Sequence, residues 1–116
     1  MLNKNEIIKE LENEQFIVRN AVYEYVCRLH LYEDKDINTA FIKFIESNYN
    51  QEINYSGLIR SKLNKEIIES LIKIHEKEEK TYIKSKIEEV IVNHYSIVRD
   101  MNYNFEELII DEECLL

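Results

Sequence analysis

Apolar residues recur every three or four positions along most of the chain, which is the spacing of one face of an α-helix. The clearest pattern, over residues 15–31, predicts the main core helix. Its expected buried positions are Phe16, Ile17, Ala21, Val22, Tyr25, Val26 and Leu29. A short lead-in helix is expected over residues 4–13, and a third begins at Asp36, a predicted N-cap, and ends near Ser47. The first half therefore predicts an antiparallel helix pair with a short helix before it.

The second half shows a similar pattern after a polar connection over residues 48–57, which contains Asn, Ser and Gly57 and is typical of a turn. One or two helical turns follow. Asn64 is expected to cap a helix that reaches His75, and Thr81 a helix that reaches Val98. We therefore predict an all-α fold of five to six helices, with stacked helix pairs at about 4–47 and 58–98. These form one domain, residues 1–99, followed by an acidic segment, 100–116, with a short helix or tail.

Composition supports a helical domain over a sheet-rich one. The 116 residues are 45% hydrophobic and 33% charged, which is typical of a globular chain. There is one glycine and no proline, so hairpin turns and glycine-rich phosphate loops are disfavoured.

Charge is unevenly distributed along the chain. The net charge is −8, and residues 100–116 hold six acids and no base. Since nucleic acids and anionic membranes are bound mainly through Lys and Arg, we expect neither direct nucleic-acid binding nor membrane binding. The N-terminus is charged from Lys4 and no run of 18 apolar residues occurs, so no signal peptide or membrane span is predicted. The two distant cysteines, Cys27 and Cys114, favour a cytoplasmic location.

Few residues form a pattern associated with catalysis or metal binding. Cys27 and His30 are spaced as two zinc ligands, but a structural zinc site takes four. His75 begins an HExxE sequence, which lacks the second histidine of zinc peptidases. We interpret Cys27 as a buried apolar residue and His30 as a residue at a helix C-terminus. We therefore expect no catalytic residue, no metal and no cofactor, and hence no enzyme.

Residues 11–45 resemble a HEAT-like, or armadillo-type, helical repeat. The matching residues are Leu11, the polar turn at 12–14, Val18-Arg19-Asn20-Ala21, Tyr25, Val26, Leu29, Asp36 and 40–45. The resemblance implies a superhelix of stacked helix pairs that binds other proteins, with Arg19 reaching an acidic or backbone acceptor of an adjacent unit. An irregular helical bundle stays open as the alternative architecture, because residues 58–98 lack the Val-Arg-x-Ala sequence.

The expected function is a noncatalytic protein–protein interaction module whose partner is another protein or a second copy. Eight tyrosines support a partner surface, because their rings pack while their hydroxyls stay hydrated. Arg19 is one candidate partner-binding residue. The alternative is a small acidic inhibitor, or antidefence protein, that blocks a basic cleft on a nucleic-acid-binding protein. Its candidate residues are Glu106, Glu107, Asp111, Glu112 and Glu113.

Overall fold

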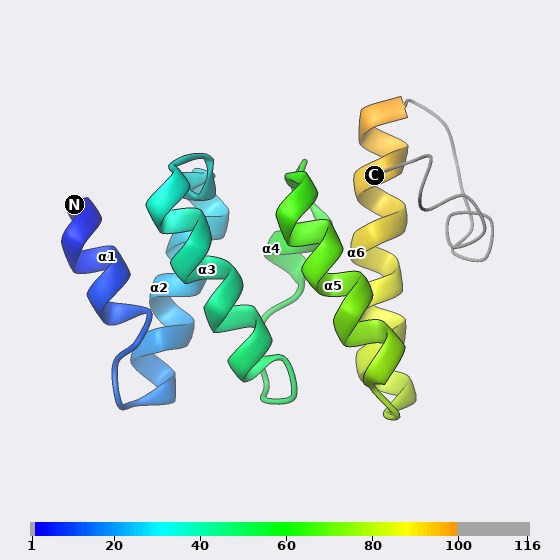
Figure 1. Ribbon diagram of the computed structural model, residues 1–116, viewed down its shortest axis with the longest axis horizontal. Coiled ribbons are helices and arrows are strands. Elements are labelled where there is room, and N and C mark those ends of the chain that lie inside the picture. The colour runs from blue at the N-terminus through cyan, green and yellow to red at the C-terminus, as the bar shows by residue number, and fades with distance from the viewer. Residues whose placement is uncertain (1, 100–116) are drawn as a thin grey trace. The chain divides into compact units, whose positions relative to one another are not determined.

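The computed structural model describes residues 2–99, and this part of the chain is all-α, as predicted (Figure 1). It contains six α-helices and one 3-10 helix at Leu31–Glu33, and no β-strand. The α-helices are α1 (Lys4–Glu10), α2 (Phe16–Leu29), α3 (Lys35–Asn48), α4 (Ser56–Ile59), α5 (Lys65–Lys77) and α6 (Thr81–Arg99). None of these helices is both long enough and apolar enough to cross a membrane. The short helix expected near the C-terminus falls outside the described residues.

The chain divides between Gly57 and Leu58 into two compact units, which we describe separately. In unit 1, α2 runs antiparallel to α1 and α3, and the three helices contact one another (Figure 1). Asn3 starts α1 by accepting a hydrogen bond from the backbone N–H of Glu6 at 2.9 Å. His30 ends α2 in the left-handed conformation, with φ of 54°. Histidine is among the non-glycine residues that enter this region more often than most. The predicted place of His30 at a helix C-terminus is confirmed.

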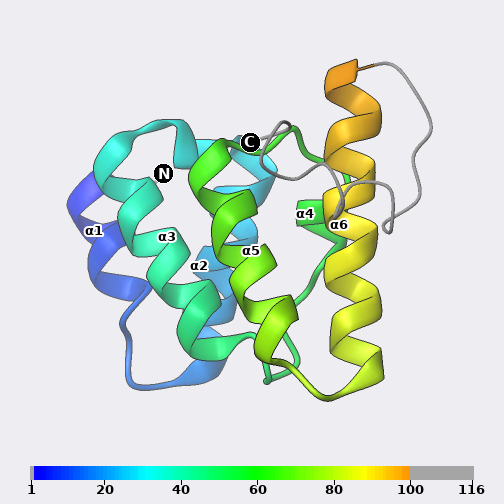
Figure 2. The ribbon, with the colours of Figure 1, turned by 45° about the vertical axis from the view of Figure 1, so that its right-hand side comes forward.

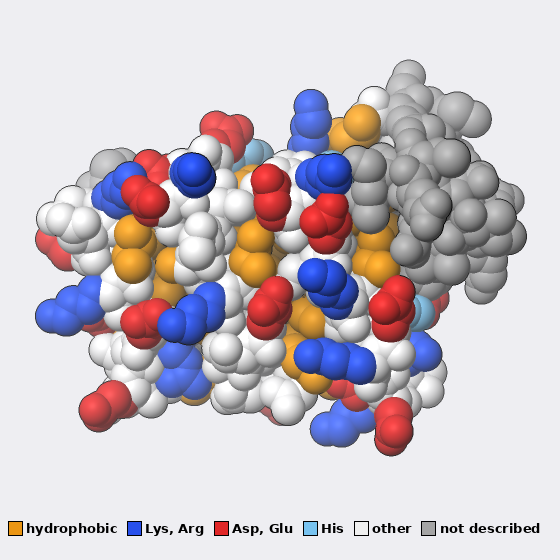
Figure 3. Space-filling view, in the orientation of Figure 1, with side chains coloured by type: hydrophobic (Ala, Val, Ile, Leu, Met, Phe, Trp, Pro, Cys, Tyr) orange, Lys and Arg blue, Asp and Glu red, His pale blue; other side chains and the backbone are white. Residues whose placement is uncertain are grey.

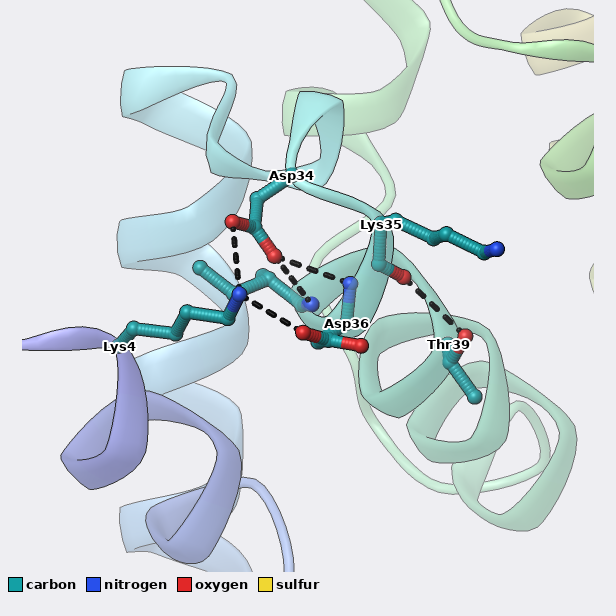
Figure 4. A network of polar contacts seen from close by, with 6 residues as sticks. Lys4, Asp34, Lys35, Asp36 and Thr39 are labelled. Atoms are coloured by element: carbon teal, nitrogen blue, oxygen red, sulfur yellow. Dashed lines mark hydrogen bonds and ion pairs between the residues drawn. The ribbon is translucent and has the colours of Figure 1, made fainter.

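The N-cap of α3 lies two residues before the predicted one. Asp34, rather than Asp36, is the N-cap, and its carboxylate accepts hydrogen bonds from the backbone N–H groups of Asp36 and Ile37 at 2.9 and 3.1 Å. Lys4 of α1 pairs with Asp34 and Asp36 at 3.1 and 2.7 Å (Figure 4). These hydrogen bonds and the Lys4 ammonium hold the pKa of Asp34 below its usual value. Both acids thus serve the contact between α1 and α3, but only Asp34 caps the helix.

The buried face of α2 agrees with the predicted one only in part: Val22 and Val26 are buried as expected, but Leu29 is 43% exposed. Ile17 is 76% exposed and Ala21 is also exposed, whereas Tyr23 and Cys27 are buried. Tyr23 is fully enclosed, because its ring stacks against Phe41 and Phe44 with centroids 5.4 and 4.9 Å away. Apolar residues occupy more than one side of α2, so the α3 rings decide which side faces inward.

Gly57 was expected in a turn, but it lies in a helix and allows close packing against Cys27. It lies in α4, and its φ is not positive. A Cβ on Gly57 would lie 2.9 Å from the Cβ of Cys27, closer than two such carbons can approach. The backbone of α4 therefore approaches α2 as closely as it does because position 57 has no side chain.

Unit 2 consists mainly of the antiparallel helices α5 and α6, which lie side by side (Figures 1 and 2). Asn64 caps α5, as predicted, by accepting a hydrogen bond from the backbone N–H of Ile67 at 2.9 Å. The amide of Asn93 in α6 donates to the backbone carbonyl of Ile59. The most deeply buried core residues of this unit are aliphatic: Leu58, Ile67, Ile68, Leu71, Ile74, Ile87, Val90 and Ile91.

Candidate functional site

An open pocket of about 370 Å³ lies in unit 1, where the loop before α2 meets the C-terminal half of α3. Its apolar part is formed by Leu11 and Phe44, which are 2% and 3% exposed. Arg19 and Asn48 contribute polar groups to the lining. The pocket thus combines an apolar base with hydrogen-bonding side chains, a combination typical of binding sites.

Arg19 is held in place by three acceptors, all in unit 1. Its Nη1 donates to the backbone carbonyls of Asn13 and Glu14 at 2.8 and 3.0 Å. Its Nη2 donates to Oδ1 of Asn48 at 3.0 Å. The guanidinium therefore joins the loop before α2 to α3. The HEAT-like resemblance implied an acceptor on an adjacent helix pair, whereas these three acceptors lie within unit 1.

Asn48 is the buried partner that fixes the Arg19 guanidinium from the α3 side. It is 4% exposed, and its Nδ2 donates to the backbone carbonyl of Phe44 at 2.8 Å. Its Oδ1 also accepts from Nε2 of Gln51 at 2.8 Å. Because the Asn48 amide is bonded on both sides, its orientation, and hence the position of the guanidinium, is well determined.

Arg19 forms no ion pair with an acid in the part of the chain that the structure describes, although Glu12 and Glu14 line the same pocket. All three of its acceptors are neutral, and the guanidinium also lies 5.5 Å from the Phe16 ring centroid. A neutral acceptor satisfies an N–H donor but leaves the positive charge uncompensated. The pocket therefore has an immobilised cation in its lining.

An exposed ion pair stands at the edge of the pocket. Nζ of Lys43 lies 3.0 Å from Oε1 of Glu12, and the two side chains are 69% and 58% exposed. Basic and acidic side chains are visible next to each other on the face that shows α1 and α3 (Figure 3). Ion pairs exposed to this degree contribute little to stability because water and salt screen them. The Lys43–Glu12 pair therefore adds little to the stability of the pocket.

The spaced pair Cys27 and His30 does not converge on one point. Cys27 is 3% exposed, and burial raises the pKa of its thiol to about 12. His30 is exposed at the end of α2, where its ring stacks on Tyr32 with centroids 5.8 Å apart. The interpretation of Cys27 as a buried apolar residue is confirmed. Between residues 2 and 99, no group of three or more His, Cys, Asp or Glu side chains is placed to share a metal ion.

His75 pairs across the helices of unit 2 and not along its own helix. Its Nε2 lies 2.8 Å from Oε2 of Glu88 in α6, and the two side chains are 14% and 35% exposed. Glu79, the last residue of the HExxE sequence, is exposed just beyond α5. His75 and Glu88 thus connect α5 to α6, a structural role that their separation in sequence did not reveal.

His94 is the buried histidine of unit 2. Its Nδ1 accepts a hydrogen bond from the backbone N–H of Leu63 at 3.0 Å, which requires the neutral ring to carry its proton on Nε2. Burial, and to a lesser extent the charge of Lys62, lower the pKa of His94 below its ordinary value of 6.5. Protonation would place a hydrogen on Nδ1 and break the bond to Leu63.

We expect the free energy of unfolding to decrease as the pH falls through 6.5, because the unfolded chain then binds a proton at His94 that the folded chain does not. The decrease levels off below the lowered pKa of the folded state. Urea unfolding at pH 8.0 and pH 5.5 measures it. His94→Asn is the control, because its Oδ1 can accept from Leu63 without titrating. An equal pH dependence in the variant and the parent would contradict the prediction.

The structure places only one of the predicted partner-binding residues, because Glu106, Glu107, Asp111, Glu112 and Glu113 lie outside the described residues. Arg19 lies in the pocket lining. Asn48 and the carbonyls of Asn13 and Glu14 complete the site, and the sequence did not point to them. Backbone carbonyls have no sequence signal, and a single asparagine 29 positions away has no pattern that would pair it with Arg19.

Comparison of the chain with protein-family models, with curated proteins and with solved structures finds no match. We therefore infer function from the residues and geometry of the site.

Proposed function

We propose that this protein is a noncatalytic protein–protein interaction module of the HEAT-like helical type, and that the pocket beside Arg19 is its binding site. The observation that carries the proposal is the immobilised guanidinium of Arg19. Its position is fixed before a ligand binds, so ordering it costs little additional side-chain entropy on association. Arginine is also enriched among the residues that contribute most to binding at protein interfaces.

The local architecture supports a binding role for this end of unit 1. The pocket is formed by two helices and the loop between α1 and α2, and the contacts of Arg19 hold these elements together. Sites held by rigid elements bind with less reorganisation than sites on unsupported loops. Two helix pairs in succession, α2 with α3 and α5 with α6, are also what a HEAT-like array requires.

The chemistry of the pocket supports binding over catalysis. Arg19, Asn48 and Gln51, three of its polar side chains, are engaged with one another or with the backbone. Cys27, elsewhere in unit 1, is protonated at neutral pH because burial raises its pKa to about 12, so it is a poor nucleophile.

A site-specific photo-crosslink in cells that express the protein tests the proposal. p-Benzoylphenylalanine at position 47 replaces the exposed Ser47, which lines the pocket. We expect a discrete adduct with one protein, either another polypeptide or a second copy. The adduct should decrease at least tenfold when Arg19→Met is added, because the fixed cation is then lost.

The same photo-crosslinker at the exposed Ser85 of α6 is the matched control, because this position lies in unit 2. Circular dichroism of the Arg19→Met protein establishes whether the helices are intact. The proposal is wrong if positions 47 and 85 give the same adducts, or if Arg19→Met leaves the adduct at position 47 unchanged in a folded protein.

A further inference from the structure

We propose that the pocket of unit 1 binds the C-terminal carboxylate of a partner polypeptide whose last side chain is apolar, with Arg19 holding the carboxylate. This inference rests on the proposed function and names the chemistry of the partner segment. It follows from the uncompensated guanidinium, from the apolar base beside it, and from the charge of the unit around it.

The guanidinium of Arg19 has donor capacity left for a ligand. The Nε–H takes part in none of its three hydrogen bonds, and only one bond of the described residues uses Nη2. A carboxylate matches the planar donor geometry of arginine and would also supply the negative charge that Asn13, Glu14 and Asn48 do not provide through their neutral acceptors. Of the groups that a polypeptide presents, a carboxylate is the one that satisfies both needs.

The apolar part of the pocket lining would select the side chain of the last residue of the partner. Leu11 and Phe44 line the pocket on the inside, together with the partly buried Ala40. A pocket of about 370 Å³ holds one or two side chains and not a long segment. An apolar side chain next to the carboxylate would therefore lie against Ala40 and the small exposed parts of Leu11 and Phe44 while the carboxylate meets Arg19.

The charge of unit 1 favours a single carboxylate over an acidic stretch. Residues 1–57 contain ten acids and six bases, and the acids Glu12 and Glu14 line the pocket. A segment with several acidic side chains would be repelled by these carboxylates. A chain end brings one carboxylate, and the N–H groups just before it can donate to acids at the edge of the pocket, such as Glu12.

Paired peptides test this proposal on the unmodified protein. Fluorescein-labelled octapeptides with a Gly-Ser interior end in Leu, Ile, Phe, Met or Ala, and each is made both as the free acid and as the C-terminal amide. We expect the free acids with large apolar ends to bind at least tenfold more tightly than their amides and than the Ala peptide, as measured by fluorescence polarisation. Equal binding of acids and amides, or no binding up to millimolar protein, would overturn the proposal.

Variants of the protein test whether Arg19 causes the preference for the free-acid peptides. Arg19→Met should remove the preference for the free acid, and Asn48→Asp should weaken acid binding at least tenfold by placing a competing carboxylate 3.0 Å from the guanidinium. Arg28→Met is the matched control, because Arg28 is exposed on the same helix and outside the pocket lining. If Arg28→Met reduces binding as much as the folded Asn48→Asp protein does, Arg19 is not the receptor of the carboxylate.

The peptide assay tests the C-terminal carboxylate, and the photo-crosslink tests the proposed function, so either one can be rejected without the other. A position-47 adduct that depends on Arg19, together with equal binding of acids and amides, would keep the proposed function and refute the C-terminal carboxylate. An acidic peptide with an amidated end that binds better than every free acid would instead identify a side-chain carboxylate as the ligand and overturn the inference.

Discussion

Replacing Tyr23 with alanine is expected to lower the free energy of unfolding by about 3–5 kcal/mol, the usual cost of removing a large buried ring. The ring is fully enclosed between Phe41 and Phe44, and its hydroxyl donates to the backbone carbonyl of Asn54 at 3.0 Å. Alanine would leave a cavity between these aromatic rings and an acceptor without its donor. Urea unfolding followed by circular dichroism measures the change.

Two further variants separate the ring from its hydroxyl. Tyr23→Phe keeps the stacking and removes the hydroxyl with its bonds to Asn54 and Cys27, so we expect a loss of about 1–2 kcal/mol. Tyr25→Ala is the matched control on the same helix, because its ring is only partly buried and lies beside the exposed Arg28. If Tyr25→Ala destabilised the protein as much as Tyr23→Ala, the assignment of Tyr23 to the core would be incorrect.

The second large effect is expected from a single added methyl group. Gly57→Ala places a Cβ 2.9 Å from the Cβ of Cys27, so the backbones of α4 and α2 must move apart. We expect a loss of about 1–3 kcal/mol, which is the typical cost of overpacking a core. The sign of the change in the free energy of unfolding distinguishes a steric clash from its absence. Without a clash, replacing glycine by alanine in a helix stabilises the protein by up to about 1 kcal/mol. Urea unfolding gives both the sign and the size.

A double-mutant cycle identifies the steric cause. Cys27→Gly removes the Cβ and the Sγ that Gly57→Ala would meet at 2.9 and 3.4 Å. On this background the Gly57→Ala substitution should cost much less than in the parent, so the two changes are not additive. Additive effects would show that the close contact with Cys27 is not the reason for glycine at position 57.

The candidate site was only partly predictable because its residues carry different kinds of signal. Arg19 interrupts an apolar pattern and is visible at once in the sequence. Asn48 is one of several asparagines near the end of α3, and nothing local separates it from Asn50, which is exposed. The bond between Arg19 and Asn48 joins positions 29 residues apart, so it exists only after α2 and α3 pack together.

Local signals predicted some helix starts and missed others for a similar reason. Asn64 caps α5 as expected, because its bond to Ile67 lies within the helix that it starts. At α3, two aspartates two positions apart are both suitable caps. The observed cap is Asp34, and the ion pairs of Lys4 from α1 hold both acids in place. Residue type does not distinguish the two positions, and the Lys4 ion pairs involve both of them.

Helical periodicity predicted that residues 2–99 are helical and approximately where α2, α3, α5 and α6 lie. Helical periodicity and caps such as Asn64 are local properties, because they involve residues within one or two turns. Tertiary structure decided which side of α2 is buried, why position 57 is glycine, and what Arg19 contacts. These outcomes depend on Phe41, Cys27 and Asn48, which approach their partners only on packing. Close packing and hydrogen-bond satisfaction between distant segments are therefore the physical origin of the pocket.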